Sequence, residues 1–335
     1  MTSPADTPMV PTQAPPRTRA VSRDRPGARR RARMSWRDRV RRDWQMLLMV
    51  APAMIILLVF TYVPLLGNII AFQDYSPFIG ILDSPFVGLA HFERMFGSDA
   101  FWRSVVNTLM ITTAQLIFFF PVPIVLALLL NSLISERAKA TVQAVIYLPY
   151  FFSWVLVVTL FQQIFGGAGV IATFMRQQGW QPIDLMTNPD TFIALITAQA
   201  VWKDAGWSAI VFLAALSTVD VTLYEAAAVD GAGRWRRLWH VTLPALRPVI
   251  VLMLILRLGN SLNVGFEQVL LQRDAVGART AEVLDTYVYY TGLVNADWAY
   301  GAAAGLFKGA VGLALVLAAN KVAHMLGDQG VYAKR

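Results

Sequence analysis

Six long apolar segments, separated by polar stretches, dominate the pattern of this sequence. They run roughly over residues 46–70, 105–130, 141–165, 191–217, 247–271 and 300–326. A helix needs about 20 apolar residues to cross the hydrocarbon core of a bilayer, and each segment is long enough. The pattern therefore predicts an all-α, polytopic membrane protein with six transmembrane helices.

The composition agrees with a membrane protein and excludes several kinds of catalytic and metal site. Hydrophobic residues make up 56% of the 335 residues and charged residues 15%, so much of the apolar surface is expected to face lipid. There is no cysteine, which excludes disulfides and thiol catalysis. The three histidines, His91, His240 and His324, lack the spacing of metal ligands. We expect no cofactor in this chain.

Charge alternates from one loop to the next, and this alternation predicts the orientation of the chain. One set of loops is acidic, with Asp74, Asp83, Glu93, Asp99, Asp184, Asp190, Asp274, Glu282, Asp285 and Asp297. The other set is basic, with the N-terminal arm, Arg137, Lys139, Arg234, Arg236, Arg237, Arg247, Lys321, Lys334 and Arg335. Basic loops stay in the cytoplasm. We therefore expect both termini to be cytoplasmic.

The N-terminal arm carries most of the net charge of +8, with twelve arginines between Arg17 and Arg42. A basic arm can bind nucleic acid, but an apolar segment follows at once and Trp36 is its only aromatic residue, so we expect no nucleic acid. A signal peptide is the second alternative, but the apolar stretch 44–71 is too long for one. We interpret residues 1–43 as a disordered cytoplasmic arm at an anionic membrane surface and residues 44–335 as the transmembrane domain.

A loop at 218–246, between the fourth and fifth apolar segments, has a distinctive spacing. It reads Glu-Ala-Ala-Ala-Val-Asp-Gly at 225–231 and, after nine residues, Val-Thr-Leu-Pro at 241–244. The first half contains good helix formers, and Asp220 can cap its start. Gly231 permits a turn that lays a second short helix, 235–240, against the first. The charge pattern places this loop in the cytoplasm.

This spacing resembles the EAA loop of bacterial ABC-importer permeases, except that Val241 stands where the pattern has Ile. Further segments are similar to the carbohydrate branch of that family, which imports multiple sugars and polysaccharides and includes the alginate and rhamnogalacturonan importers. The similarity covers about residues 45–335. The segments that carry it are 148–154, 202–207, 224–232, 239–244, 265–269, 285–289 and 305–308.

The resemblance implies a MetI-like fold and a heteromeric complex in the bacterial inner membrane. Its members would be a second permease subunit, two ATPase subunits that bind ATP and Mg²⁺, and an extracytoplasmic sugar-binding protein, with an oligosaccharide as the substrate. The chain itself lacks a G-x-x-x-x-G-K-[ST] phosphate loop. The resemblance assigns ATPase coupling to Glu225, Ala226, Ala227, Asp230, Gly231, Leu243 and Pro244.

Polar residues within the apolar segments are candidates for the sugar path, because charges in lipid are costly. Asn260, Asn263 and Glu267 are spaced i, i+3, i+7 and would share one helix face, with Lys203 and the aromatic Trp202 at similar depth. The alternative is an internal salt bridge, such as Glu267 with Lys308. Adjacent positions do not face each other on a helix, so Lys203 needs a partner other than Asp204, or the helix breaks there.

Glycines and prolines also mark the apolar segments. Gly301, Gly305 and Gly309 recur every four residues and form a smooth face for close helix packing. Proline residues at 121, 123 and 149 are expected to kink or break their helices, as packing kinks or as gating hinges.

Two other classes of protein are alternatives. Gly-Trp-Ser-Ala at 206–209 superficially resembles a membrane serine-protease motif. A protease would need a general base within reach of the serine, but all three histidines map to loops or segment ends. We therefore expect no enzyme. A secondary transporter would normally show internal repeats, which this sequence lacks.

Overall fold

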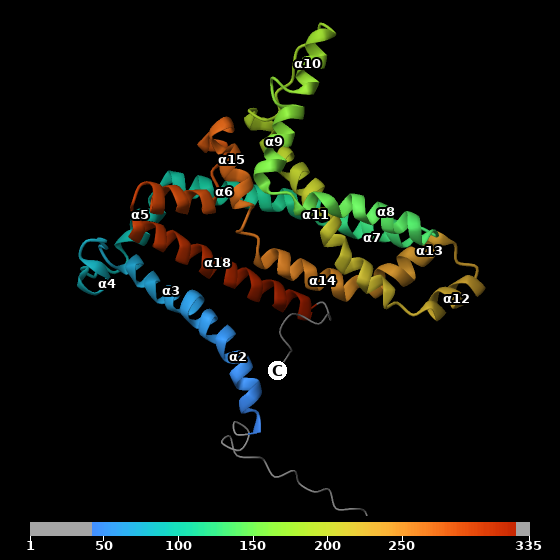
Figure 1. The fold of residues 1–335 in the computed structure, drawn as a ribbon, viewed down its shortest axis with the longest axis horizontal. Coiled ribbons are helices and arrows are strands. Elements are labelled where there is room, and N and C mark those ends of the chain that lie inside the picture. Colours follow the sequence, from blue (N-terminus) through green and yellow to red (C-terminus); the bar gives the residue numbers. More distant parts are fainter. Residues whose placement is uncertain (1–41, 326–335) are drawn as a thin grey trace, which may run out of the picture. The chain divides into compact units, whose positions relative to one another are not determined.

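The computed structural model describes residues 42–325. The contacts divide the chain into one unit that ends at Tyr62 and a second that begins at Val63. The basic arm predicted over 1–43 lies outside the described residues, apart from Arg42 and Asp43. Within 42–325 the regular elements are helices, with one isolated bridge between Gln73 and Phe86 (Figure 1).

The first unit consists of α2 (Trp44–Leu57) and a π-helical turn (Leu58–Tyr62). None of the side chains in these two elements is buried. They begin an apolar helical stretch, Trp44–Phe72, that is long enough to cross a membrane. This stretch agrees with the predicted first span, and its exposed apolar surface suits contact with lipid.

The second unit opens with the short helices α3 (Val63–Leu66), a 3₁₀ helix (Gly67–Phe72), α4 (Gly80–Asp83) and α5 (Ala90–Phe96). A long helix follows, built from α6 (Asp99–Ala114), a π-helical turn (Gln115–Phe119) and α7 (Pro121–Asn131). It confirms the second predicted span and extends it. Pro121 is the first residue of α7 and follows the π-helical turn after Phe120, at a position where a missing backbone donor is tolerated.

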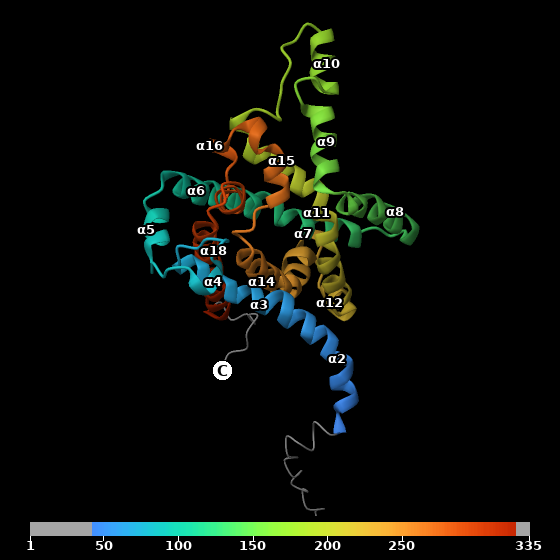
Figure 2. The same cartoon turned by 60° about the vertical axis from the view of Figure 1, so that its left-hand side comes forward.

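The predicted third span, 141–165, is wrong as a continuous helix. It is divided into α8 (Glu136–Tyr147), a 3₁₀ turn (Leu148–Phe151) and α9 (Trp154–Phe165), which α10 (Val170–Gln177) follows (Figure 2). Pro149 lies in the 3₁₀ turn, and the Ser153 hydroxyl accepts a hydrogen bond from the backbone of Leu156 and caps α9. The apolar stretch with the length of a span is therefore Trp154–Gln177.

Helix α11 (Phe192–Ser217) matches the fourth predicted span and packs along α7. Its central glycine, Gly206, allows a close approach, because a Cβ there would lie 2.3 Å from the carbonyl oxygen of Ile146 at the end of α8. After α11 the chain bends by 68° into α12 (Val221–Val229).

The predicted fifth span, 247–271, is also wrong at both ends. The helix starts earlier, at α13 (Arg234–Arg237), and continues through a π-helical turn (Leu238–Thr242) into α14 (Leu243–Gly259), where it stops. The rest of the unit is α15 (Phe266–Val276), α16 (Ala278–Ala281), α17 (Leu284–Val288), a π-helical turn (Tyr289–Val294) and α18 (Trp298–Met325). Helix α18 matches the sixth predicted span.

Five helices in the described range are long and apolar enough to cross a membrane, or six if the bent pair α11–α12 counts as one span. Apolar side chains join the helices of the second unit. One buried cluster contains Ala127 of α7, Phe212 of α11 and Leu246 of α14. Helix α14 also packs against α18, and Gly301 of α18 packs closely on Gly292. The all-α prediction holds for the described residues.

Candidate functional site: an exposed loop and a cavity beside a broken helix

The loop at 218–246 folds as a capped helix, a tight turn and a second helix, beyond the end of α11 (Figure 1). The Asp220 carboxylate accepts a hydrogen bond of 2.9 Å from the backbone N–H of Thr222, which lowers the pKa of Asp220. Gly231 adopts a φ of +74°, a left-handed conformation that favours glycine. Both features were predicted from the sequence.

The second helix of the loop differs from the prediction, because it does not end at residue 240. It runs without a break from Arg234 to Gly259, and Pro244 occupies the first turn of α14 rather than a boundary. Two contacts join the halves of the loop. The hydroxyls of Tyr224 and Thr242 are 3.0 Å apart, and Arg237 Nε donates to the carbonyl of Ala232 at 2.8 Å.

The predicted coupling residues are mostly solvent-exposed. Glu225, Ala226, Asp230, Gly231 and Pro244 are exposed, whereas Ala227 and Leu243 are half-buried. Large apolar side chains are exposed beside them, with Val229 at 89% and Trp235 at 75%. An exposed surface that combines apolar side chains with the carboxylates of Glu225 and Asp230 suits contact with another protein.

The proposed path residues Asn260, Asn263 and Glu267 do not share a helix face, which corrects the prediction. Helix α14 ends at Gly259, so Asn260 is its C-cap, Asn263 lies in a loop and Glu267 lies in the first turn of α15. Small polar side chains favour such a break, because they compete for backbone hydrogen bonds. All three side chains are exposed.

The break is stabilised by specific contacts. Gly265 adopts a φ of +51° and starts α15. The Thr112 hydroxyl of α6 donates a hydrogen bond to the carbonyl of Ser261, a backbone group that no longer has a helical donor. Irregular backbone at membrane depth is tolerated where neighbouring groups or water satisfy it.

Lys203 is buried, and its contacts are with Tyr150, Trp154 and Asp204 rather than with the three residues at the break. Its Nζ donates to the carbonyl of Tyr150 at 2.8 Å and lies 5.1 Å from the centre of that ring. Asp204 is also near, with 3.6 Å between Lys203 Nζ and Asp204 Oδ1, and α11 continues unbroken. Thus Lys203 has the separate partner that the spacing predicted, and it also contacts its neighbour.

Trp202 is partly exposed, and its ring packs against Phe152 and Phe161. Lys308 pairs with Asp285 of α17, so the alternative of a salt bridge between Glu267 and Lys308 is wrong. The proposed path residues are therefore distributed over several surfaces.

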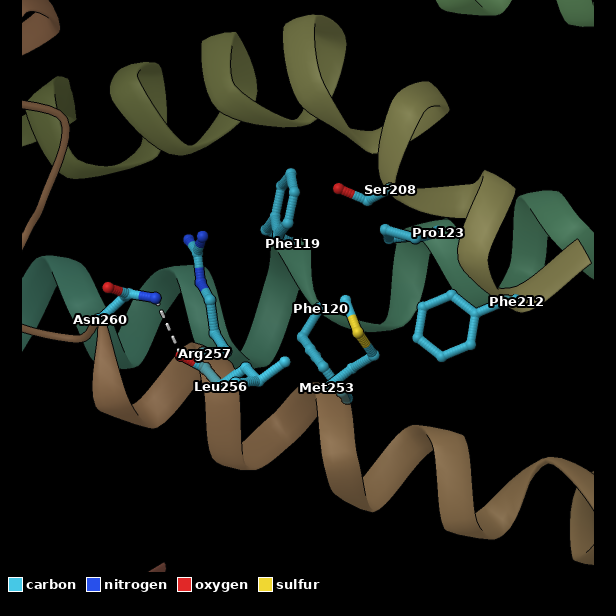
Figure 3. Close-up of a pocket in the computed structure, with 9 residues that line it drawn as sticks. All are labelled: Phe119, Phe120, Pro123, Ser208, Phe212, Met253, Leu256, Arg257 and Asn260. Atoms are coloured by element: carbon cyan, nitrogen blue, oxygen red, sulfur yellow. Dashed lines mark hydrogen bonds between the residues drawn. The ribbon is translucent and has the colours of Figure 1, made fainter. Parts of the chain in front are cut away.

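A cavity of about 210 Å³ lies between α7, α11 and α14 (Figure 3). Its walls are mainly apolar, and its polar lining consists of Ser208, Arg257 and Asn260. Arg257 Nη2 donates to Gln115 Oε1 at 2.6 Å, and its guanidinium lies 4.9 Å from the centre of the Phe119 ring. Sequence reasoning missed Arg257, although a charge ten residues inside an apolar segment is a clear signal.

A buried cluster of three glutamines, which sequence reasoning also missed, joins α11 to α15. Gln268 Nε2 and Gln272 Nε2 donate to Gln199 Oε1 at 2.8 and 3.0 Å, and Gln199 Nε2 donates to Gln272 Oε1 at 3.1 Å. The three side chains are at most 1% exposed. The cluster holds the helix after the break in a fixed position on α11.

The helices, the cavity and the exposed loop define a polytopic membrane permease. The chain belongs to the family of binding-protein-dependent transport system inner membrane components, whose model matches residues 119–327. The family consists of permease subunits of ABC importers, which are not enzymes, and an EAA loop is typical of it. In residues 42–325 no group of three or more His, Cys, Asp or Glu residues could hold a metal ion.

Known relatives are permease subunits of sugar importers. The chain is 48% identical to the polygalacturonan/rhamnogalacturonan transport system permease protein YteP of Bacillus subtilis, over 85% of this chain and 89% of that protein. It is 42% identical to the protein LplB of the same organism, over 89% of this chain and 94% of the other.

Solved structures show the same fold. The chain is similar to a chain of a bacterial ABC transporter that imports the acidic polysaccharide alginate. The TM-score is 0.80 at 36% identity, over 87% of this chain and 98% of that one. A second structure shows a bacterial alginate ABC transporter in complex with its periplasmic protein bound to an alginate pentasaccharide, again with a TM-score of 0.80.

Proposed function

We propose that this chain is a permease subunit of an importer for oligosaccharides, and that it couples their passage to ATP hydrolysis through the loop 218–246. The observation that carries the proposal is the geometry of this loop. Its exposed first helix, α12, is tied through Tyr224 and Thr242 to a helix that continues as far as the cavity. A force applied to α12 therefore reaches the residues that line the cavity.

The importer would be a heteromeric complex. A second permease subunit would complete the path, two ATPase subunits would bind ATP and Mg²⁺, and an extracytoplasmic binding protein would deliver the sugar. The alginate transporter that this chain resembles is seen with its periplasmic binding protein, which supports the last of these partners. The positive charge of the basic loops supports a cytoplasmic location for both termini and for the loop 218–246.

The relatives and the cavity support the proposed substrate class. The relatives handle polygalacturonan, rhamnogalacturonan and alginate, which are uronate-containing polysaccharides. Asn260 lines the cavity, and its amide can exchange hydrogen bonds with sugar hydroxyls. Asn263, Glu267, Trp202 and Lys203 stay candidates for other parts of the path, with Lys203 the weakest because it is buried against Tyr150.

Charge reversal in the loop tests the coupling role. In the complete complex in proteoliposomes, Glu225→Lys is expected to abolish ATP-dependent uptake, because the exposed carboxylate is replaced by a cation at the ATPase contact. Glu136→Lys is the matched control. Glu136 is an exposed carboxylate at the start of α8, in the basic loop that contains Arg137 and Lys139. Wild-type uptake by Glu225→Lys, or equal loss in both variants, would contradict the coupling role.

A further inference from the structure

Arg257 is the one ionisable residue among those that line the cavity between α7, α11 and α14. Figure 3 shows its side chain and that of Asn260 extending from neighbouring turns at the end of α14. Its contacts with Gln115 and with the Phe119 ring orient the guanidinium without neutralising its charge. A positive charge thus sits in a mainly apolar cavity.

The position of Arg257 makes this charge costly. Arg257 follows Arg247 by ten residues of continuous helix, a rise of about 15 Å along the span. An arginine at such depth normally faces a wet cavity or a pairing partner. Half-buried rather than enclosed, Arg257 remains accessible from the cavity.

The carboxylate that interacts electrostatically with Arg257 is shared with another cation. Asp204 of α11 interacts with Arg257, but it also lies 3.6 Å from Lys203 Nζ. Two cations and one carboxylate leave one positive charge in excess beside the cavity. Low local dielectric strengthens the attraction of such a charge for an anion.

We propose that Arg257 is a specificity-determining residue that binds the carboxylate of a uronate unit as an acidic oligosaccharide passes through the cavity. A guanidinium presents five N–H donors in a planar fork that matches the two oxygens of a carboxylate. Gln115 accepts from Nη2 and holds the fork in place. Asn260, three residues further along the chain, binds hydroxyls of the same sugar. This assignment rests on the proposed import of oligosaccharides.

A purely structural role for Arg257 makes a different prediction. If the residue only ties α14 to the π-helical turn that begins at Gln115, its loss weakens the complex regardless of the charge of the sugar. Comparing an acidic sugar with its neutral ester separates the two roles, because the ester keeps the shape of the sugar and removes its charge.

The test uses the complex of both permease subunits and the ATPases, without the binding protein, so that only the permeases discriminate. Binding of trigalacturonate and trimannuronate is measured by titration, each as the free acid and as the methyl ester. Arg257→Gln is expected to weaken binding of the acids at least tenfold and to leave binding of the esters unchanged. Arg257→Lys is expected to retain part of the preference, and Arg176→Gln, which removes an exposed arginine of α10, to retain all of it.

A second variant keeps the test decisive if Arg257→Gln does not assemble. Asp204→Asn removes the shared carboxylate and is expected to strengthen binding of the acids at least threefold relative to the esters. Equal effects on acid and ester, or no effect in either variant, would overturn the role of Arg257. Import of neutral oligosaccharides alone by the wild-type complex would also overturn the role of Arg257, but it would agree with the proposed function. Failure to import any oligosaccharide, with the binding protein added, would instead refute the proposed function.

Discussion

The hydroxyl oxygens of Tyr224 and Thr242 lie 3.0 Å apart, although the residues are separated by 18 positions. Tyr224 belongs to α12, and Thr242 is the buried last residue of the π-helical turn that leads into α14. The pair therefore links the exposed helix of the loop to the spanning helix that lines the cavity.

Tyr224→Phe is expected to loosen this link without unfolding the loop. A neutral hydrogen bond contributes about 1 kcal/mol, and the aromatic ring is retained. Uptake per ATP hydrolysed should therefore fall severalfold, whereas sugar binding should stay the same. The measurement is the ratio of uptake to ATP hydrolysis in proteoliposomes, with Tyr75→Phe in an unrelated loop as the control. An unchanged ratio in Tyr224→Phe would show that the link does not transmit force.

Two glycines of the same loop provide a matched test of backbone strain. A Cβ at Gly231 or at Gly233 would meet no atom within 4 Å, but only Gly231 has a positive φ, of +74°. Gly231→Ala should therefore cost about 1–2 kcal/mol through conformation alone. It should weaken co-purification of the ATPase with the permeases, whereas Gly233→Ala should not.

Gly231→Asn extends this test, because asparagine tolerates left-handed conformations better than alanine. Partial recovery of ATPase binding is expected. Equal behaviour of the Ala and Asn variants would mean that the conformation at residue 231 does not limit docking.

The glutamine cluster is expected to be a major stabilising contact between α11 and α15. Gln199→Leu removes the acceptor of one side-chain N–H of Gln268 and of one of Gln272, although each amide keeps its bond to a backbone carbonyl. Each N–H left buried without an acceptor costs about 1–3 kcal/mol. The melting temperature of the purified complex should fall by several degrees. Gln177→Leu, on an exposed position of α10, should leave it unchanged. A melting temperature unaffected by Gln199→Leu would refute this role.

Cysteine labelling tests the orientation, because the chain has no cysteine of its own. Thr187→Cys, in the exposed loop before α11, should react with an impermeant thiol reagent added to intact cells. Thr218→Cys, at the exposed start of the loop 218–246, should react only after the membrane is opened. The opposite labelling pattern would place the loop outside the cell and exclude contact with a cytoplasmic ATPase.

Hydropathy predicted the helices that are uniformly apolar. The observed stretches Trp44–Phe72, Asp99–Asn131 and Trp298–Met325 match the predicted segments 46–70, 105–130 and 300–326. The ends agree to within two residues, except that the second stretch begins six residues earlier than predicted. The loop 218–246 was also predictable, because the cap at Asp220 and the turn at Gly231 are local features of the chain.

The helix breaks were not predicted, because hydropathy averaged over about twenty residues is insensitive to a short turn. Gly-Asn-Ser at 259–261 and Gly265 are turn-forming residues within the apolar segment 247–271, and they end α14 there. Pro149 was recognised as a breaker but was treated as an interruption of one span, whereas α9 starts anew at Trp154.

The partners across helices could not be predicted from spacing. Lys308 pairs with Asp285, and Gln199 meets Gln268 and Gln272 some seventy residues away. Such pairs depend on how the helices pack, and periodicity along one helix contains no information about that. The same holds for the cavity, since its walls come from three helices.

The unbroken helix from Arg234 to Gly259 would act as a lever if the loop couples to an ATPase as proposed. Its 26 residues correspond to a length of about 39 Å, with the loop at one end and the cavity at the other. A tilt of about 10° imposed near Arg234 would carry Gly259 through roughly 7 Å, more than one helical turn. The chain beyond Gly259 can yield to that swing, because it leaves the helix there, while the glutamine cluster holds α15 to α11. If an ATPase docks on the loop as proposed, its small movements would thus be magnified at the cavity.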